Sequence, residues 1–197
     1  MLLSTLLTAQ KTVHKVVEDT TITSITIDAS HAYELVVKTS ASSKIDIKAI
    51  MEGEYKDDLL INTKKESGRF VVSTAFRPLY KNPNDKLSAH KVISILMIVE
   101  LPENMELMIL GSGVNIDLSG TYKTLNANIT QGNFTITDFE GNGEIQTFEG
   151  AISVSNYEGS ITAYSKYGKI HGRNTAKGKG VLTLKTVNGS IYINKPK

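Results

Sequence analysis

Three glutamates recur at a spacing of nine residues in the C-terminal half, each between an aromatic residue and a glycine: Glu140, Glu149 and Glu158. Two such carboxylates on stacked strands would lie about 5 Å apart and repel each other, and a divalent cation would relieve that repulsion. Ca²⁺ prefers about six to eight oxygen ligands, however, and the Asp-rich repeats that usually supply them are missing from the sequence. We therefore expect a solvated turn face here and no metal site.

An aromatic series runs at almost the same period and comprises Phe139, Phe148, Tyr157 and Tyr167, the last of which lacks the following glutamate. If two segments form one coil, Phe139 stacks over Tyr157 and Phe148 over Tyr167, as two ladders on opposite sides. Exposed ladders can stack against sugar rings or a partner protein, whereas buried ladders shield the stacked strands from water. We favour the structural interpretation and keep the four aromatic residues, with the three glutamates, as binding candidates.

Catalytic signatures are missing from the sequence. The chain has no cysteine, which excludes disulfides, thiolate nucleophiles and cysteine-based zinc sites. It contains neither an HExxH zinc motif nor a GxSxG nucleophile elbow, and Gly178-Lys179-Gly180 is too short for a phosphate loop. We expect no enzyme and no cofactor. The enzymatic alternative is a β-helix polysaccharide lyase or hydrolase with Glu149, Glu158, Lys166 and His171 on one face of the coil.

The charge balance argues against nucleic acid as a partner. The 197 residues carry a formal net charge of +2, from 22 basic and 20 acidic side chains, without a concentrated basic patch. Only three of the basic residues are arginines, which disfavours bidentate clamps on phosphate or carboxylate groups. With 40% hydrophobic residues, the chain can bury a core and fold as a globular protein.

The first ten residues, MLLSTLLTAQ, resemble the last part of a secretory signal peptide. Leucines form an apolar run, and small and hydroxyl residues follow near Thr8-Ala9, where cleavage would occur. The alternative is a short helix or strand that packs on the domain. We expect no transmembrane segment, because the longest other apolar run, 92–99, has only the length of a strand. The expected location is the periplasm, the outer-membrane surface or the extracellular space.

Alternation of apolar and polar residues with a period of two predicts β-strands along nearly the whole chain. Residues 77–90 contain two of the four prolines and several charges, and predict an exposed loop. A hairpin turn is expected at Glu66-Ser67-Gly68. Helical periodicity is nearly absent, so the expected fold class is all-β. In the N-terminal half, strands are expected over 21–27, 34–38, 44–51, 59–63, 70–76, 92–101 and 105–110.

From residue 111 onward the strands shorten and glycines recur at near-regular intervals, which is the mark of a repeat architecture. An apolar residue follows most of these glycines at a fixed offset, as in Gly150 with Ile152 and Gly189 with Ile191. A segment of about nine residues holds one short strand and one turn, and such a strand can bury its apolar face only by stacking on neighbours. The pattern predicts a β-solenoid with coils of about 18 or about 27 residues. A meander of antiparallel hairpins is the alternative.

Three features of the chain carry a resemblance to a known family. A long strand ends in Leu101-Pro102-Glu103-Asn104, a Gly-Ser-Gly-Val-Asn-Ile segment follows at 111–116, and Gly-x-Ile copies recur to the C-terminus. This layout resembles the bacterial "putative adhesin" family of exported proteins, also called head-domain adhesin-like. The resemblance covers nearly the whole chain after the first ten residues. It implies a right-handed, single-stranded β-solenoid at the cell envelope, and it supplies no catalytic residues.

The expected organisation is a signal-peptide remnant over 1–10, an N-terminal β region over 11–110 and solenoid repeats over 111–197, with one continuous core. The expected function is non-catalytic binding or adhesion at the cell envelope or surface, with a surface glycan or an envelope protein as partner. Assembly is a further alternative. A coil that ends with the strand 190–194 would leave an open solenoid end, which could pair with a second copy to form a homodimer.

Overall fold

The computed structural model describes residues 10–53, 57, 59–76, 94–173 and 178–194. No α-helix occurs within these residues, and the predicted all-β class is confirmed. The expected loop over 77–90 and the expected signal-peptide remnant lie outside the described residues, except that Gln10 begins the first strand. That strand was not predicted from the sequence.

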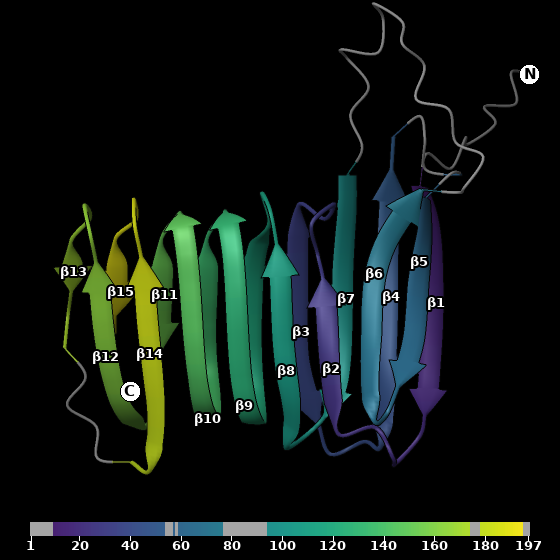
Figure 1. Cartoon of the computed structure of the whole chain (residues 1–197), viewed down its shortest axis with the longest axis horizontal. Coiled ribbons are helices and arrows are strands. Elements are labelled where there is room, and N and C mark those ends of the chain that lie inside the picture. Colours follow the sequence, from purple (N-terminus) through teal and green to yellow (C-terminus); the bar gives the residue numbers. More distant parts are fainter. Residues whose placement is uncertain (1–9, 54–56, 58, 77–93, 174–177, 195–197) are drawn as a thin grey trace, which may run out of the picture.

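The hydrogen-bonded strands form two layers, which face each other across the core (Figure 1). Each layer is one ladder of strands, and the two long strands β9 and β10 take part in both. The front layer contains, from left to right in Figure 1, β12 (Gly159–Ser165), β14 (Gly180–Thr186), the second halves of β10 (Phe134–Glu149) and β9 (Asn115–Gln131), β8 (Met105–Gly111), β2 (Ser24–Asp28), β6 (Arg69–Phe76) and β5 (Leu59–Glu66).

The back layer runs in the same direction. It contains β13 (Ile170–His171), β15 (Ile191–Ile193), β11 (Ile152–Ser155), the first halves of β10 and β9, β3 (Glu34–Ser40), β7 (Ser94–Pro102), β4 (Lys44–Glu52) and β1 (Gln10–Glu18). Alternation in the sequence gives each strand one buried and one outward face. In β7, for example, Ile95, Met97 and Val99 are buried, whereas the residues between them are partly exposed.

The C-terminal half stacks in parallel with a constant offset. Ile116 of β9 pairs with Phe134 of β10, and Phe134 pairs with Ile152 of β11, so one coil takes 18 residues. Each such coil supplies one strand to each layer, which selects the shorter of the two coil lengths left open by the sequence. Every pair among the described strands β9 to β15 is parallel, so the antiparallel meander is wrong.

The N-terminal half departs from this pattern, and the sheet as a whole is mixed. The pairs β1 with β4, β4 with β7 and β5 with β6 are antiparallel. The turn between β5 and β6 is the predicted hairpin: Ser67 has a φ of 46° and Gly68 a φ of 82°, the left-handed pair that reverses a chain tightly. A uniform coil along the whole chain, as in a single-stranded solenoid, is therefore wrong for this half.

The last two segments of the chain change the order of stacking. β14 pairs with β10 on one side and β12 on the other, and β15 lies between β11 and β13 in the same way. The C-terminal coil is thus inserted behind the coil that precedes it in sequence. The prediction that strand 190–194 forms an open end is wrong, because β12 and β13 occupy that place.

One hydrophobic cluster extends from Ile22 in the N-terminal half to Ile193 near the C-terminus. At one edge of the stack the backbones approach so closely that only glycine fits. A Cβ atom on Gly150, whose φ is +135°, would lie 1.9 Å from the carbonyl oxygen of Gly132. One on Gly189 would lie 1.8 Å from the carbonyl oxygen of Gly150. This column of close approaches explains why glycine recurs with the coil.

Candidate functional site

A buried aromatic ladder runs along one edge of the two layers. Tyr122 stacks on Phe139 with ring centroids 5.8 Å apart, and Phe139 packs on Tyr157 at 5.7 Å. All three rings are buried. The Tyr157 hydroxyl donates a hydrogen bond to the carbonyl of Gly141 at 3.1 Å, and burial raises the pKa of Tyr157 to about 12. The predicted stacking of Phe139 over Tyr157 is confirmed, and in this structure both rings pack on the core.

Tyr122 is a member of the ladder that the periodic search missed. It precedes Phe139 by 17 residues, whereas Tyr157 follows Phe139 by 18. The difference comes from a bulge in β10, where the register shifts between Thr137 and Phe139. Asp138 occupies the bulge with a φ of 51°. A search that allowed a slip of one residue would have found Tyr122.

The second predicted ladder does not form. Phe148 and Tyr167 are both exposed, at 53% and 71%. The inserted C-terminal coil separates them: the amide of Asn188 bonds to the carbonyl of Phe148, and the amide of Tyr167 bonds to that of Val187. The predicted stacking of Phe148 over Tyr167 is therefore wrong, although each ring is accessible by itself.

The three periodic glutamates lie at two different edges, because nine residues are half of an 18-residue coil. Glu140 and Glu158 line a hollow of about 540 Å³, together with Asp138, Asn156 and Lys179. Glu149 lies at the opposite edge, where it accepts a hydrogen bond from Gln131 Nε2 at 2.9 Å. Within the described part of the chain, no group of three or more His, Asp or Glu side chains is arranged to hold a metal ion.

The four residues of the enzymatic alternative do not share one face. Glu158 directly precedes the seven-residue strand β12, and Lys166 directly follows it. These two positions are therefore separated by the length of the strand, about 26 Å at 3.3 Å per residue. His171 belongs to β13 in the back layer, where its ring stacks on Tyr192 with centroids 4.9 Å apart. Their placement on one face is wrong.

The outward face of the front layer carries a second set of polar side chains, which the sequence did not single out. We call it the amide patch. In strand register, Leu110 lies beside Asn128, and Asn128 beside Gln146. One step along the strands, Met108 lies beside Asn126, and Asn126 beside Glu144. The members of the amide patch are Met108, Leu110, Asn126, Asn128, Glu144 and Gln146, and they line an open hollow of about 280 Å³.

Charge in the amide patch is locally neutralised. Lys185 Nζ donates to Glu144 Oε1 at 2.6 Å and Gln146 Nε2 donates to the same oxygen at 2.7 Å. These bonds, with that of Lys185 first, hold the pKa of Glu144 below its ordinary value. By contrast, Asn126 and Asn128 are exposed, and neither side-chain amide is hydrogen-bonded to another described residue. Their donors and acceptors are thus free to bind a ligand.

The two sides of the amide patch differ in chemistry. Met108 and Leu110 are 39% and 41% exposed, and they place apolar surface beside the free amides of Asn126 and Asn128. Farther along the same face, beyond Lys185, Tyr164 is 60% exposed. The face therefore offers hydrogen-bonding groups and apolar contact side by side, without a net charge at its centre.

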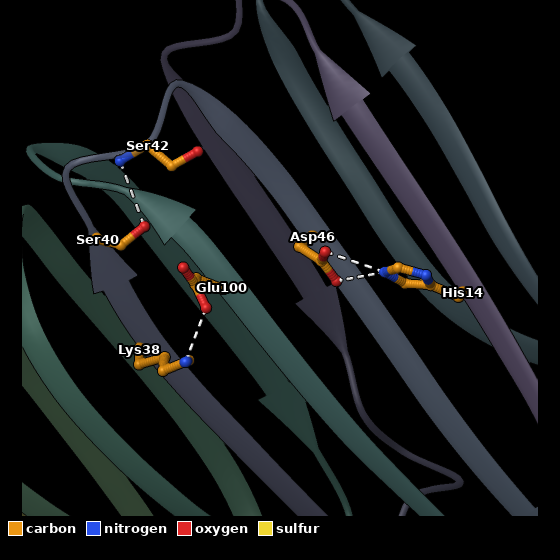
Figure 2. A network of polar contacts seen from close by, with 6 residues as sticks. All are labelled: His14, Lys38, Ser40, Ser42, Asp46 and Glu100. Atoms are coloured by element: carbon orange, nitrogen blue, oxygen red, sulfur yellow. Dashed lines mark hydrogen bonds and ion pairs between the residues drawn. The ribbon is translucent and has the colours of Figure 1, made fainter.

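The back layer carries a polar network of a different kind (Figure 2). Lys38 Nζ of β3 lies 2.7 Å from Glu100 Oε2 of β7, and His14 Nε2 of β1 lies 2.9 Å from both carboxylate oxygens of Asp46 in β4. Asp46 and Glu100 are directly opposite in the antiparallel pair β4 and β7. Two like charges face each other there, and each is offset by a partner on its far side. This network stabilises strand pairing and offers no cavity.

Among the described residues, no helix has the length and hydropathy needed to cross a bilayer. The fold is similar to that of a solved structure described as a "putative cell adhesion protein" from Clostridium sporogenes, with a TM-score of 0.64 and 16% sequence identity over 95% of this chain and 100% of that chain. A "putative adhesin" from Bacteroides fragilis matches with a TM-score of 0.45 and 13% identity over 93% of this chain and 97% of that chain.

A third solved structure, a "putative lipid binding protein" from Parabacteroides distasonis, matches with a TM-score of 0.28 and 12% identity over 94% of this chain and 97% of that chain. No family model matches the sequence, and no curated protein matches it. The structural neighbours from Clostridium and Bacteroides carry the adhesin name of the family that the sequence resembles. At these identities, the Clostridium structure supports the fold alone.

Proposed function

We propose that the protein is a non-catalytic binding module of the bacterial cell envelope or cell surface, and that its amide patch binds a neutral, hydroxyl-rich polymer such as a surface glycan. The observation that carries this proposal is the pair of free amides, Asn126 and Asn128, in register on an open face. Amide groups donate and accept hydrogen bonds at once, as sugar hydroxyls do. Met108 and Leu110 supply apolar surface for the C–H faces of a sugar ring.

Charge pairing favours a neutral ligand over a charged one. Glu144 is bonded to Lys185, and Glu106, farther along the face, is bonded to Lys123 at 2.7 Å. A polyanion or polycation would have to compete with these pairs. A protein partner is the second ligand class, but protein interfaces concentrate energy in large apolar anchors, and the centre of the patch has no aromatic residue.

The scaffold that we propose for this face is a right-handed β-solenoid with two strands per coil. The support is the offset of 18 residues between stacked strands and the column of glycines at one edge. Crossovers between parallel strands are right-handed in about 98% of cases. Stacked coils give the face a regular strand spacing of about 4.8 Å, which suits an extended polymer.

Export is part of the proposal. It is supported by the family resemblance and by the adhesion-protein description of the Clostridium structure, which shares the fold. Expression of the native gene with a C-terminal tag, followed by cell fractionation, tests it. A protein recovered only from the cytoplasm would contradict an envelope role.

A glycan-array screen with a parallel pull-down from envelope extracts tests the ligand. We expect neutral glycans to bind, and the double substitution Asn126→Ala/Asn128→Ala to reduce binding at least about tenfold, as loss of two hydrogen bonds predicts. Asn62→Ala is the matched control, because Asn62 is also exposed and lies on β5 of the same layer. Equal loss in the control, or retention of binding in the double variant, would contradict the assignment.

Binding without catalysis has its own test. Incubation of the wild-type protein with uronic-acid polymers should leave the ultraviolet absorbance unchanged, because elimination by a lyase would create an absorbing double bond. A steady rise in absorbance that scales with protein concentration would instead favour the polysaccharide-lyase alternative.

A further inference from the structure

The stack of strands has two ends, and they differ in how their edges are protected. At one end lie β12 and β13, and at the other lie β1 and β5 (Figure 1). Among the described strands, β12 pairs only with β14 and β13 only with β15. A strand paired on one side leaves hydrogen-bonding groups of its backbone open on the other, which can template pairing with another chain.

Charged side chains protect the end formed by β1 and β5. Lys11 Nζ of β1 donates to the carbonyl of Leu59 at 2.9 Å, and Lys15 Nζ donates to the carbonyl of Ile61 at 2.8 Å. These lysines occupy outward carbonyls of the edge strand β5 and place charge where another strand would have to dock.

The opposite end lacks this protection and leaves the core open. β12 reads GSITAYS and contains no Lys, Arg, Asp or Glu. Its inward residues Ile161 and Ala163 are only partly buried, although their neighbours in the next strand, Leu182 and Leu184, are 0% exposed. The apolar rows of the core therefore continue to this end without a cover from the described residues.

β13 repeats the observation in the back layer. Ile170 is 47% exposed, whereas its register partner Ile191 in β15 is fully buried. Both layers thus present an aliphatic residue and an unpaired strand edge at the same end. A partner that continues both layers at once would cover them.

We propose that this end binds a second copy of the chain, with the two β12 strands antiparallel around a two-fold axis at Thr162. Thr162 is the central residue of the strand, so full overlap places it opposite itself. Ile161 then lies opposite Ala163 of the second copy, on the core side. Such isologous contacts are the commonest way in which identical chains associate.

Charge complementarity supports this register. With Thr162 on the axis, Glu158 of one copy lies opposite Lys166 of the other, on each side of the axis. Both residues are exposed and belong to no ion pair among the described residues. The two opposite charges would form two equivalent bridges and would disfavour a slipped register. The axis also keeps both front layers on one side, so the dimer presents two amide patches on one surface and can bind a polymer with avidity.

Sedimentation velocity and disulfide trapping test the proposal. The chain contains no cysteine, so Thr162→Cys introduces a single thiol. Residues opposite each other in an antiparallel pair have Cα atoms about 4.5–5.5 Å apart, within the range that a disulfide can span. Under mild oxidation we expect a covalent dimer of Thr162→Cys. Thr12→Cys, an equally exposed threonine on the edge strand β1, should stay monomeric.

A charge-swap series separates specific pairing from loss of folding. Glu158→Lys and Lys166→Glu should each weaken dimerisation about tenfold, and the double variant should restore it, because the two bridges are re-formed with reversed polarity. Wild-type protein that sediments as a monomer at millimolar concentration would overturn the proposal. So would equal trapping of the two cysteine variants, or a double variant that dimerises no better than the single ones.

Discussion

Gly150 illustrates how a single residue position is fixed by the stacking of coils. Its φ of +135° is unfavourable for any residue with a side chain, and the Gly132 carbonyl lies in the space that a Cβ atom would occupy. We expect Gly150→Ala to destabilise the protein by more than about 3 kcal/mol or to prevent folding, since strain and collision act together. Urea denaturation followed by circular dichroism measures the change.

Gly113 provides the matched control. It also has a positive φ, of +78°, but a Cβ atom there would have no neighbour within 4 Å. Gly113→Ala should therefore cost only the left-handed strain, about 1–2 kcal/mol. Equal destabilisation by the two substitutions would show that close approach of the coils does not determine the glycine column.

The ion pair of Lys38 and Glu100 gives the protein a defined dependence on pH. The Lys38 hydrogen bond, aided by Ser40, holds the pKa of Glu100 below its ordinary value of 4.5. Because the folded-state pKa is the lower one, the pair stabilises the fold above pH 4.5, and the contribution is lost as pH falls through the lowered value.

Lys38→Ala should raise the pKa of Glu100 toward its ordinary value. The stability difference between wild type and variant should be largest near neutral pH and shrink in acid. Carboxyl chemical shifts in an NMR titration measure the pKa, and urea denaturation from pH 3 to pH 7 measures the stability. A Glu100 titration that is unchanged in the variant would show that this pair is not formed in solution.

At the scale of elements, the insertion of the C-terminal coil makes β14 an interior strand. Leu184 is buried between β10 and β12, so Leu184→Ala should cost about 2–5 kcal/mol. Val181 lies on the same strand but is 51% exposed, and Val181→Ala should change stability by no more than about 0.5 kcal/mol. Denaturation midpoints of the two variants, measured side by side, test this difference.

Hydrogen exchange distinguishes insertion from simple sequential stacking. β14 has a neighbour on each side and β12 has one, so amide protons of β14 should exchange more slowly than those of β12. Sequential stacking would give the reverse order, because β14 would then be the end strand.

The sequence predicted the strands and the repeat well, since period-two alternation and recurring glycines follow directly from backbone geometry. It could not predict the order of the last coils, because Gly180 with Leu182 fits the series as well in either place. Side-chain size gave a hint that was not used. The strand with Leu182 and Leu184 is interior, whereas the strand with the smaller Ala163 lies at the end.

The candidate site was less predictable than the fold. Buried ladder residues such as Phe139 stand out in a periodic search because they repeat. The amide patch draws its residues from β8, β9 and β10, and only strand register brings Leu110, Asn128 and Gln146 into one row. Nothing in the local sequence around Asn128 distinguishes it from other exposed asparagines.

For the molecule as a whole, the two layers form a rigid support whose outer face is an array of side chains at fixed spacing. The face is preorganised, because its residues lie on strands rather than on loops, and a ligand need not order them on binding. A preorganised, electrically balanced face suits repeated weak contacts with a long polymer. The two-fold dimer would double the number of such contacts without any new type of site.

The most direct test is an NMR titration of the asparagine side-chain amides in ¹⁵N-labelled protein with neutral oligosaccharides, cellohexaose and chitohexaose, as probes. The account predicts that the signals of Asn126 and Asn128 shift in a saturable manner, whereas those of Asn62 on the same layer and Asn156 at the edge hollow stay in place. Shifts confined to Asn156, or no saturable shift at any side-chain amide, would contradict the assignment of the amide patch as the binding site.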